Sequence, residues 1–124
     1  MTDEELLARA DAVAVRAYAP YSGFHVGCAV LTRSGAVVEG VNVENAAYPL
    51  GVCAERATFS RAIAEGFNPG DFTVAAITAS PCGGCRQWLV EMGVERVVFR
   101  NGVRVVEMTV DELLPERFDA GDLP

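Results

Sequence analysis

Two short segments of the sequence contain residue types and spacings that suit metal chemistry. Cys82 and Cys85 are separated by two residues, a spacing at which the first turn of a helix directs both sulfurs at one ion. Cys53 also lies at a predicted helix start, so three thiolates converge on one Zn²⁺ if the two helices lie side by side. Three protein ligands leave the fourth position of tetrahedral zinc open, which is typical of a catalytic site.

A glutamate stands beside this predicted metal centre. Glu55 follows Cys53 by two residues and is close enough to face a water in the open position without being a ligand. Cys53-Ala54-Glu55 followed by Pro81-Cys82-Gly83-Gly84-Cys85 matches the signature of zinc-dependent deaminases, with Cys53 in place of the usual histidine. Three thiolates and one Zn²⁺ leave a net negative charge, which Arg56 and Arg86, each next to a predicted ligand, could offset.

The elements that must position these residues follow from the spacing of the apolar residues. Thr2 and Glu5 form a predicted capping box for an amphipathic helix over residues 3–18, which ends before Pro20. The helices predicted at Cys53–Glu65 and Cys82–Met92 each begin at a cysteine. Strands are predicted at His25–Thr32, Ala36–Val43, Phe72–Ala79, Val94–Phe99 and Val103–Met108, with a small terminal helix from Thr109.

This order of elements indicates the fold class. A hairpin followed by strand–helix–strand alternation predicts an α/β fold with three layers, α/β/α, built on a mixed sheet of about five strands. The chain has 124 residues, of which 51% are hydrophobic, enough for one core. We therefore expect a single domain over residues 1–124.

Composition narrows the classes of partner. Lys and Arg number 10 against 17 Asp and Glu, a formal net charge of −7 that weighs against nucleic-acid binding. No apolar run approaches the roughly 18 residues of a membrane span, and the N-terminus does not look like a signal peptide. The four cysteines are too few for a disulfide scaffold, so we expect thiols in a reducing cytoplasm.

Beyond the cysteines, the sequence resembles the small cytidine deaminases of the homotetrameric, three-cysteine type. The resemblance runs in family order along essentially the whole chain. It rests on the blocks Tyr18–Phe24, Val26–Gly27, Gly40–Tyr48, Cys53–Arg56, Ser80–Gln87 and Leu113–Pro115, and on Phe118 and Asp122–Leu123.

The resemblance implies a role for each matching residue. Cys53, Cys82 and Cys85 would bind one Zn²⁺ per chain, and Glu55 would carry protons. Arg56 and Gln87 would hydrogen-bond the Cys53 sulfur. The substrate contacts would comprise Phe24 against the pyrimidine, Asn42 and Glu44 on the ribose hydroxyls, the backbone of Ala54 and Ser80-Pro81 on the base edge, and Ala46, Tyr48 and Phe118 supplied by neighbouring subunits.

The resemblance also implies a reaction and an assembly. The expected activity is hydrolysis of cytidine and deoxycytidine to uridine and deoxyuridine with release of ammonia, in pyrimidine salvage. Water attacks C4 of cytosine, while Glu55 transfers protons to N3 and to the leaving amino group. The expected partners are a free nucleoside and three further copies of the chain, in a homotetramer with shared pockets and no nucleic-acid or membrane partner.

Other interpretations of the same residues remain open at this point. Cys82 and Cys85 alone would suit a structural zinc knuckle or a redox pair, and Cys28 could complete a closed four-thiolate site. We expect Cys28 to lie in the core and His25 to lie on a strand. The alternative functions are deamination of another aminopyrimidine nucleoside, and a zinc-stabilised module without catalytic activity.

Overall fold

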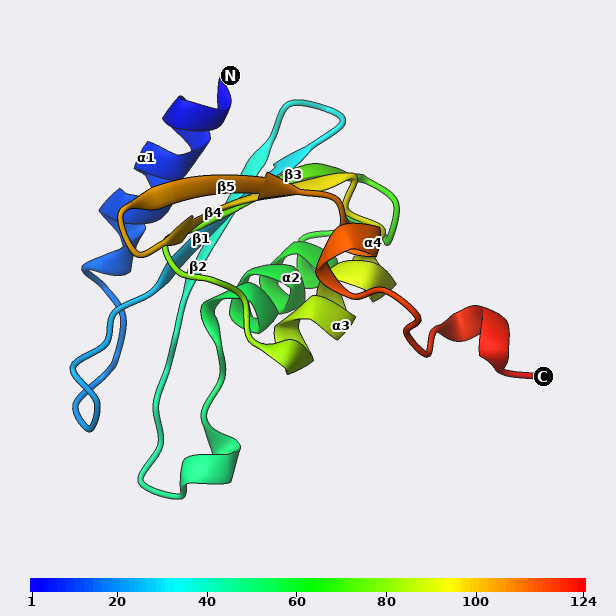
Figure 1. Ribbon diagram of the computed structural model, residues 1–124. Coiled ribbons are helices and arrows are strands. Elements are labelled where there is room, and N and C mark those ends of the chain that lie inside the picture. Colours follow the sequence, from blue (N-terminus) through cyan, green and yellow to red (C-terminus); the bar gives the residue numbers. More distant parts are fainter.

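The sheet of this protein, described for residues 1–124 in a computed structural model, has the strand order β2-β1-β3-β4-β5 (Figure 1). Only β3 and β4 run parallel; the other three neighbouring pairs are antiparallel. The strands are β1 (Gly27–Thr32), β2 (Val37–Val41), β3 (Phe72–Ile77), β4 (Arg96–Asn101) and β5 (Arg104–Met108). The mixed five-stranded sheet confirms the predicted fold class.

Helices cover both faces of this sheet. Helix α1 lies on one face, while α2 and α3 lie side by side on the other, with α4 beside α3 (Figure 1). The helices are α1 (Asp3–Ala14), α2 (Ala54–Ala64), α3 (Gly83–Met92) and α4 (Val110–Leu113), with short 3₁₀ turns at Tyr48–Leu50 and Ala120–Asp122. None of these helices is long and apolar enough to cross a membrane.

Side-chain alternation along the central strand divides the core into two parts. In β3, Val74 and Ala76 pack towards Leu6 and Ala10 of α1, while Ala75 and Ile77 belong to the larger cluster under α2 and α3. The same large cluster contains Cys28, which is fully buried, as expected. Burial on both faces explains why β3 is nearly continuously apolar.

Two predicted elements end differently in the structure. Helix α1 stops at Ala14 rather than continuing to residue 18, because the chain leaves the helix in turns and Tyr18 pairs with Val43 in an isolated bridge. Strand β1 begins at Gly27, so the prediction that His25 lies on a strand is wrong. The backbone just before Gly27 is bonded mainly to the side chain of Asn42, and the Val26 carbonyl oxygen also accepts from the Asn42 backbone N–H.

Candidate active site

Three cysteines meet where α2 and α3 begin. Cys53 caps the N-terminus of α2, Cys82 caps that of α3, and Cys85 lies in the first turn of α3. Their three Sγ atoms all lie within 4.8 Å of one another, and those of Cys53 and Cys82 are 3.9 Å apart. Sulfurs bound to one tetrahedral zinc ion lie about 3.8 Å apart, since each is about 2.3 Å from the metal. The three cysteines therefore form a site that fits one zinc ion.

The three thiols differ in how readily they ionise. Burial raises the pKa of Cys53 and of Cys85, and the charge of Glu55 also raises both. At Cys82 burial opposes ionisation, but the backbone N–H of Cys85, 3.5 Å from the Cys82 sulfur, and the neighbouring thiols lower its pKa overall. A cation among the sulfurs would favour all three thiolates, because coordinated thiols are deprotonated.

Arg56 supplies positive charge beside the sulfurs. The pKa of Arg56 is raised, first by the Cys85 side chain and then by the charges of Cys85, Cys53 and Cys82, so the guanidinium lies among all three sulfurs. Its Nε is buried without a hydrogen-bond partner. Gly84 leaves room for it, since a Cβ at that position would lie 2.3 Å from Arg56 Nη2.

Gln87 departs from its predicted contact. Its Nε2 donates to the carbonyl oxygen of Phe118 at 2.7 Å, not to the Cys53 sulfur. The physical reason is the path of the C-terminal segment, which runs beside α3 and offers backbone carbonyls there. Arg86, next to Gln87, likewise donates to the carbonyl oxygen of Leu113 at 2.9 Å.

Glu55 lies in the first turn of α2, at the wall of a hollow of about 200 Å³. Its side chain is only 4% exposed. Desolvation by burial raises the pKa of Glu55, which suits a carboxyl group that both accepts and donates a proton near neutral pH. The hollow brings together several predicted site residues; it is lined by Phe24, Val26, Asn42, Cys53, Ala54, Glu55, Ser80 and Cys82.

Asn42, predicted to face the ribose, makes two backbone hydrogen bonds at this hollow. Its Oδ1 accepts from the N–H of Val26 at 2.8 Å, and its Nδ2 donates to the carbonyl oxygen of Phe24 at 2.9 Å. The side chain therefore connects the end of β2 to the segment that carries Phe24.

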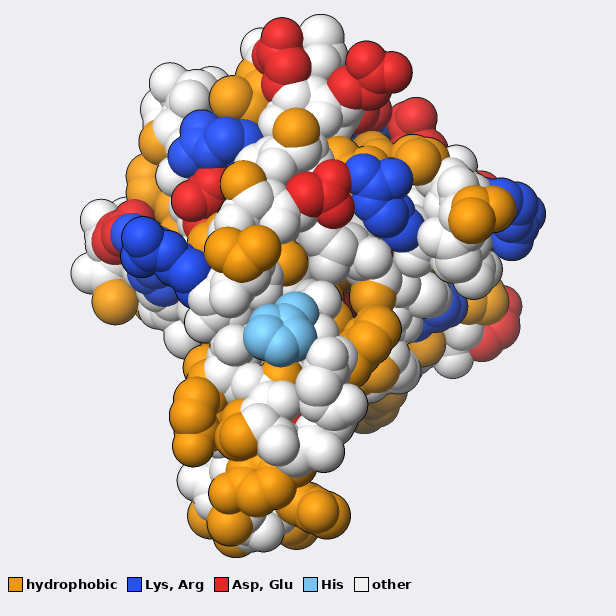
Figure 2. Space-filling view, turned by 90° about the vertical axis from the view of Figure 1, so that its left-hand side faces the viewer, with side chains coloured by type: hydrophobic (Ala, Val, Ile, Leu, Met, Phe, Trp, Pro, Cys, Tyr) orange, Lys and Arg blue, Asp and Glu red, His pale blue; other side chains and the backbone are white.

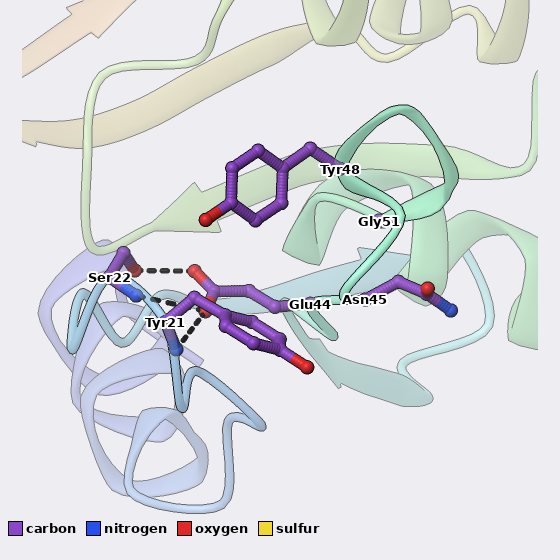
Figure 3. Close-up of a pocket in the computed structure, with 6 residues that line it drawn as sticks. All are labelled: Tyr21, Ser22, Glu44, Asn45, Tyr48 and Gly51. Atoms are coloured by element: carbon purple, nitrogen blue, oxygen red, sulfur yellow. Dashed lines mark hydrogen bonds between the residues drawn. The ribbon is translucent and has the colours of Figure 1, made fainter.

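Glu44 lies in a second hollow, of about 360 Å³, which Figure 3 shows. Its carboxylate accepts hydrogen bonds from the N–H groups of Tyr21 (2.9 Å) and Ser22 (3.1 Å) and from the Ser22 hydroxyl. These donors, the Ser22 hydroxyl first, lower the pKa of Glu44. The rings of Tyr21 and Tyr48 flank Glu44 in Figure 3, with centroids 6.0 Å apart in an edge-on arrangement.

The residues predicted to come from neighbouring subunits are all exposed in their own chain. Tyr48 is 76% exposed and lines the Glu44 hollow. Phe118 is 61% exposed, and Ala46 is also exposed; neither lines either of the two hollows.

Sequence reasoning missed Ser22 and Tyr21 as members of the site. Ser22 connects Glu44 to the backbone of Phe24, because its Oγ also accepts from the Phe24 N–H at 3.0 Å. The sequence feature that could have indicated Ser22 is the glycine that follows it, since Gly23 adopts a φ of 69°. Serine before such a glycine is typical of a turn that a hydroxyl closes onto the backbone.

Comparison with known proteins gives one consistent result. Residues 1–101 match the family described as the cytidine and deoxycytidylate deaminase zinc-binding region. The chain is 40% identical over 116 residues to a cytidine deaminase of Halalkalibacterium halodurans, covering 86% of each protein. It is 39% identical over 127 residues to that of Mycobacterium tuberculosis, covering 96% of this chain and 91% of the relative. The crystal structure of cytidine deaminase from Burkholderia pseudomallei superposes with a TM-score of 0.90 at 41% identity, covering 95% of this chain and all of that one.

Proposed function

Because the chain belongs to the family of zinc-binding cytidine and deoxycytidylate deaminases, we propose that it hydrolyses cytidine and deoxycytidine to uridine and deoxyuridine, releasing ammonia. One observation carries the proposal. The buried carboxyl group of Glu55 lines the same hollow as the sulfurs of Cys53 and Cys82, beside Phe24 and Asn42. A proton carrier next to an open metal position is the arrangement that hydrolysis of an amino group at C4 needs.

Cys53, Cys82 and Cys85 would hold the zinc. When bound, the zinc would lower the pKa of water and so make it a better nucleophile. Glu55 performs the proton transfers. It accepts a proton from the attacking water and delivers it to N3 of the cytosine ring. It then accepts the second proton, from the C4 hydroxyl that the attack has formed, and passes it to the C4 amino group, which leaves as ammonia while the C4 carbonyl forms. Burial raises the pKa of Glu55, and a raised pKa supports both halves of this transfer.

The remaining walls of the two hollows would orient the nucleoside. We assign Phe24 to packing against the pyrimidine, Asn42 and Glu44 to the ribose hydroxyls, and the backbone of Ala54 and Ser80 to the base edge. No lysine or arginine lines either hollow. Six of the ten arginines are paired with carboxylates elsewhere, which favours an uncharged nucleoside over a polynucleotide: Arg9, Arg33, Arg61, Arg96, Arg100 and Arg117.

We also propose a homotetramer in which Ala46, Tyr48 and Phe118 complete pockets of neighbouring chains. Support comes from the exposure of both aromatic rings and from the hydrophobic side chains that Figure 2 shows on the lower lobe, where Figure 1 places the segment around Tyr48–Leu50. Exposed apolar patches of this kind favour association. We propose a cytoplasmic location, because the three thiols must stay reduced. The proposed reaction would serve pyrimidine salvage.

The deciding experiment is an ultraviolet assay of cytidine loss by purified protein, with zinc determined on the same sample. We expect about one zinc per chain and turnover of cytidine. Glu55→Gln should retain zinc but lose activity by about 10³-fold or more, because the amide cannot transfer the proton. Glu65→Gln, at the exposed C-terminal end of the same helix, is the matched control and should keep full activity. Zinc-loaded protein that deaminates no cytosine nucleoside would contradict the proposal and favour a structural zinc module.

A further inference from the structure

Phe24 occupies a position that no regular secondary structure holds. It precedes β1, and its ring is 61% exposed although it lines the hollow beside Glu55. A ring used as a packing surface must nevertheless be fixed, because a mobile wall loses affinity when ligand binding orders it. The position of the ring therefore depends on the contacts that hold the backbone of Phe24.

Both polar backbone groups of Phe24 are bonded to side chains. Its carbonyl oxygen accepts from Asn42 Nδ2 at 2.9 Å. Its N–H donates to Ser22 Oγ at 3.0 Å, and the Ser22 hydroxyl in turn donates to the Glu44 carboxylate. Asn42 Oδ1 and Glu44 Oε1 hold the two ends of the same segment, through the N–H groups of Val26, Tyr21 and Ser22.

These bonds leave Asn42 and Glu44 with spare hydrogen-bonding capacity. A primary amide has two N–H groups and two acceptor lone pairs, of which Asn42 uses one each on the backbone. A carboxylate offers about four acceptor sites, of which Glu44 uses three. Each side chain can hold the segment and contact a ribose hydroxyl at the same time.

We propose that Asn42 and Glu44 are positioning residues for Phe24: together with Ser22 they form a clamp that fixes the Tyr21–Val26 segment before substrate arrives. The inference rests on the proposed function for the identity of the substrate, but the clamp itself is a property of the free chain. It assigns to Asn42 and Glu44 an effect on the base-binding wall that does not depend on any contact with the sugar.

Hydrogen–deuterium exchange of the ligand-free protein tests the clamp without any activity. In the wild type, the bonded amides of residues 21, 22, 24 and 26 should exchange slowly. Asn42→Asp replaces the donor to the Phe24 carbonyl by an oxygen, and Ser22→Ala breaks the bridge from Glu44 to the Phe24 N–H. Each should speed exchange of a peptide covering 21–26 by about tenfold or more, while peptides of α1 and β3 keep their protection. Asn101→Asp, at the exposed end of β4, is the matched control and should change nothing. Unchanged exchange in both clamp variants would overturn the proposal.

A comparison of substrates separates positioning from sugar contact. Asn42→Asp should lower kcat/KM about 10- to 100-fold for cytidine, and still by about tenfold for 2′,3′-dideoxycytidine, which lacks the hydroxyls that a ribose contact would need. A loss on cytidine that disappears on the dideoxy substrate would overturn the positioning role. If the dideoxy nucleoside is turned over too slowly, the same comparison is made with the inhibition constants of uridine and 2′,3′-dideoxyuridine. If the clamp variants exchange faster but the wild-type protein deaminates neither nucleoside, the clamp is supported and the proposed function is contradicted.

Discussion

Cys28 and Cys82 have different roles: the first packs in the core and the second belongs to the metal-binding group. Cys28 is fully buried in the large core cluster, and burial together with the nearby Glu55 charge raises its pKa, so it behaves as a small apolar side chain. Cys28→Ala should lower the free energy of unfolding by about 1–2 kcal/mol and leave the zinc content at one per chain. Cys82→Ala should abolish stable zinc binding. Metal analysis and chemical denaturation of both variants check this, and equal zinc loss in both would favour a four-thiolate site.

The Glu44 carboxylate gives a prediction about pH. Its pKa lies below the ordinary value of 4.5, first because the Ser22 hydroxyl and N–H bond to it. Burial opposes this lowering, and the Tyr21 N–H and the charge of His25 add smaller contributions to it. Because the folded pKa is lowered, its stabilising effect is fully present above 4.5 and is lost only as the pH falls through the folded pKa. Amide protection of residues 21–26, corrected for intrinsic exchange rates, should therefore be constant from about pH 7 down to 4.5 and fall only below that. Glu44→Gln should show no such acid transition, and a transition near pH 6 in the wild type would contradict the assignment.

At the scale of elements, the closeness of α2 to the sheet depends on Gly40 of β2. A Cβ there would lie 2.4 Å from Thr58 Oγ1 and 2.7 Å from the Thr58 backbone nitrogen, a clash that a side-chain rotation cannot remove. Gly40→Ala should push α2 away, lower the free energy of unfolding by about 2–4 kcal/mol and weaken zinc binding, because Cys53 moves with the helix. Gly83→Ala is the stability control, since no heavy atom lies within 4 Å of its added Cβ. Denaturation midpoints and zinc dissociation constants measure both effects, and equal stability of the two variants would refute the close-packing argument.

The same elements show what local sequence determines. The caps at Thr2 and Thr109 and the turn at Asn101-Gly102 are local features, and the predicted helix starts and hairpin occur where expected. The ends that differ depend on distant partners. Helix α1 stops early because Tyr18 pairs with Val43, and β1 starts late because Asn42 bonds the backbone of Phe24 and Val26. The spacing of apolar residues within 3–32 cannot predict either contact, because the partner residues lie outside this segment.

For the whole molecule, the metal centre was more predictable than its surroundings. Cysteine spacing and helix starts bring Cys53, Cys82 and Cys85 together once α2 and α3 lie side by side on one face of the sheet, as they do here. The contacts of Arg56 and Gln87 were not predictable, since both depend on space: the gap left by Gly84 and the path of the chain near Phe118. Tyr48 and Phe118 depend on a further step, the association of chains.

Association of chains gives the last prediction, because a shared pocket can be repaired by mixing subunits. Glu55→Gln removes the proton carrier, and Phe118→Ala removes a ring that is exposed in its own chain. Each variant alone should be nearly inactive. In mixed oligomers, a Phe118→Ala chain retains Glu55 and can receive Phe118 from a Glu55→Gln neighbour, so random equal mixing should restore roughly a quarter of the wild-type rate. The two variants are unfolded and refolded together, with separately refolded samples combined afterwards as the control, and light scattering gives the oligomeric state. Restored activity in the co-refolded sample alone would support the shared pocket, whereas no restoration in verified mixed tetramers would place each complete pocket within one chain.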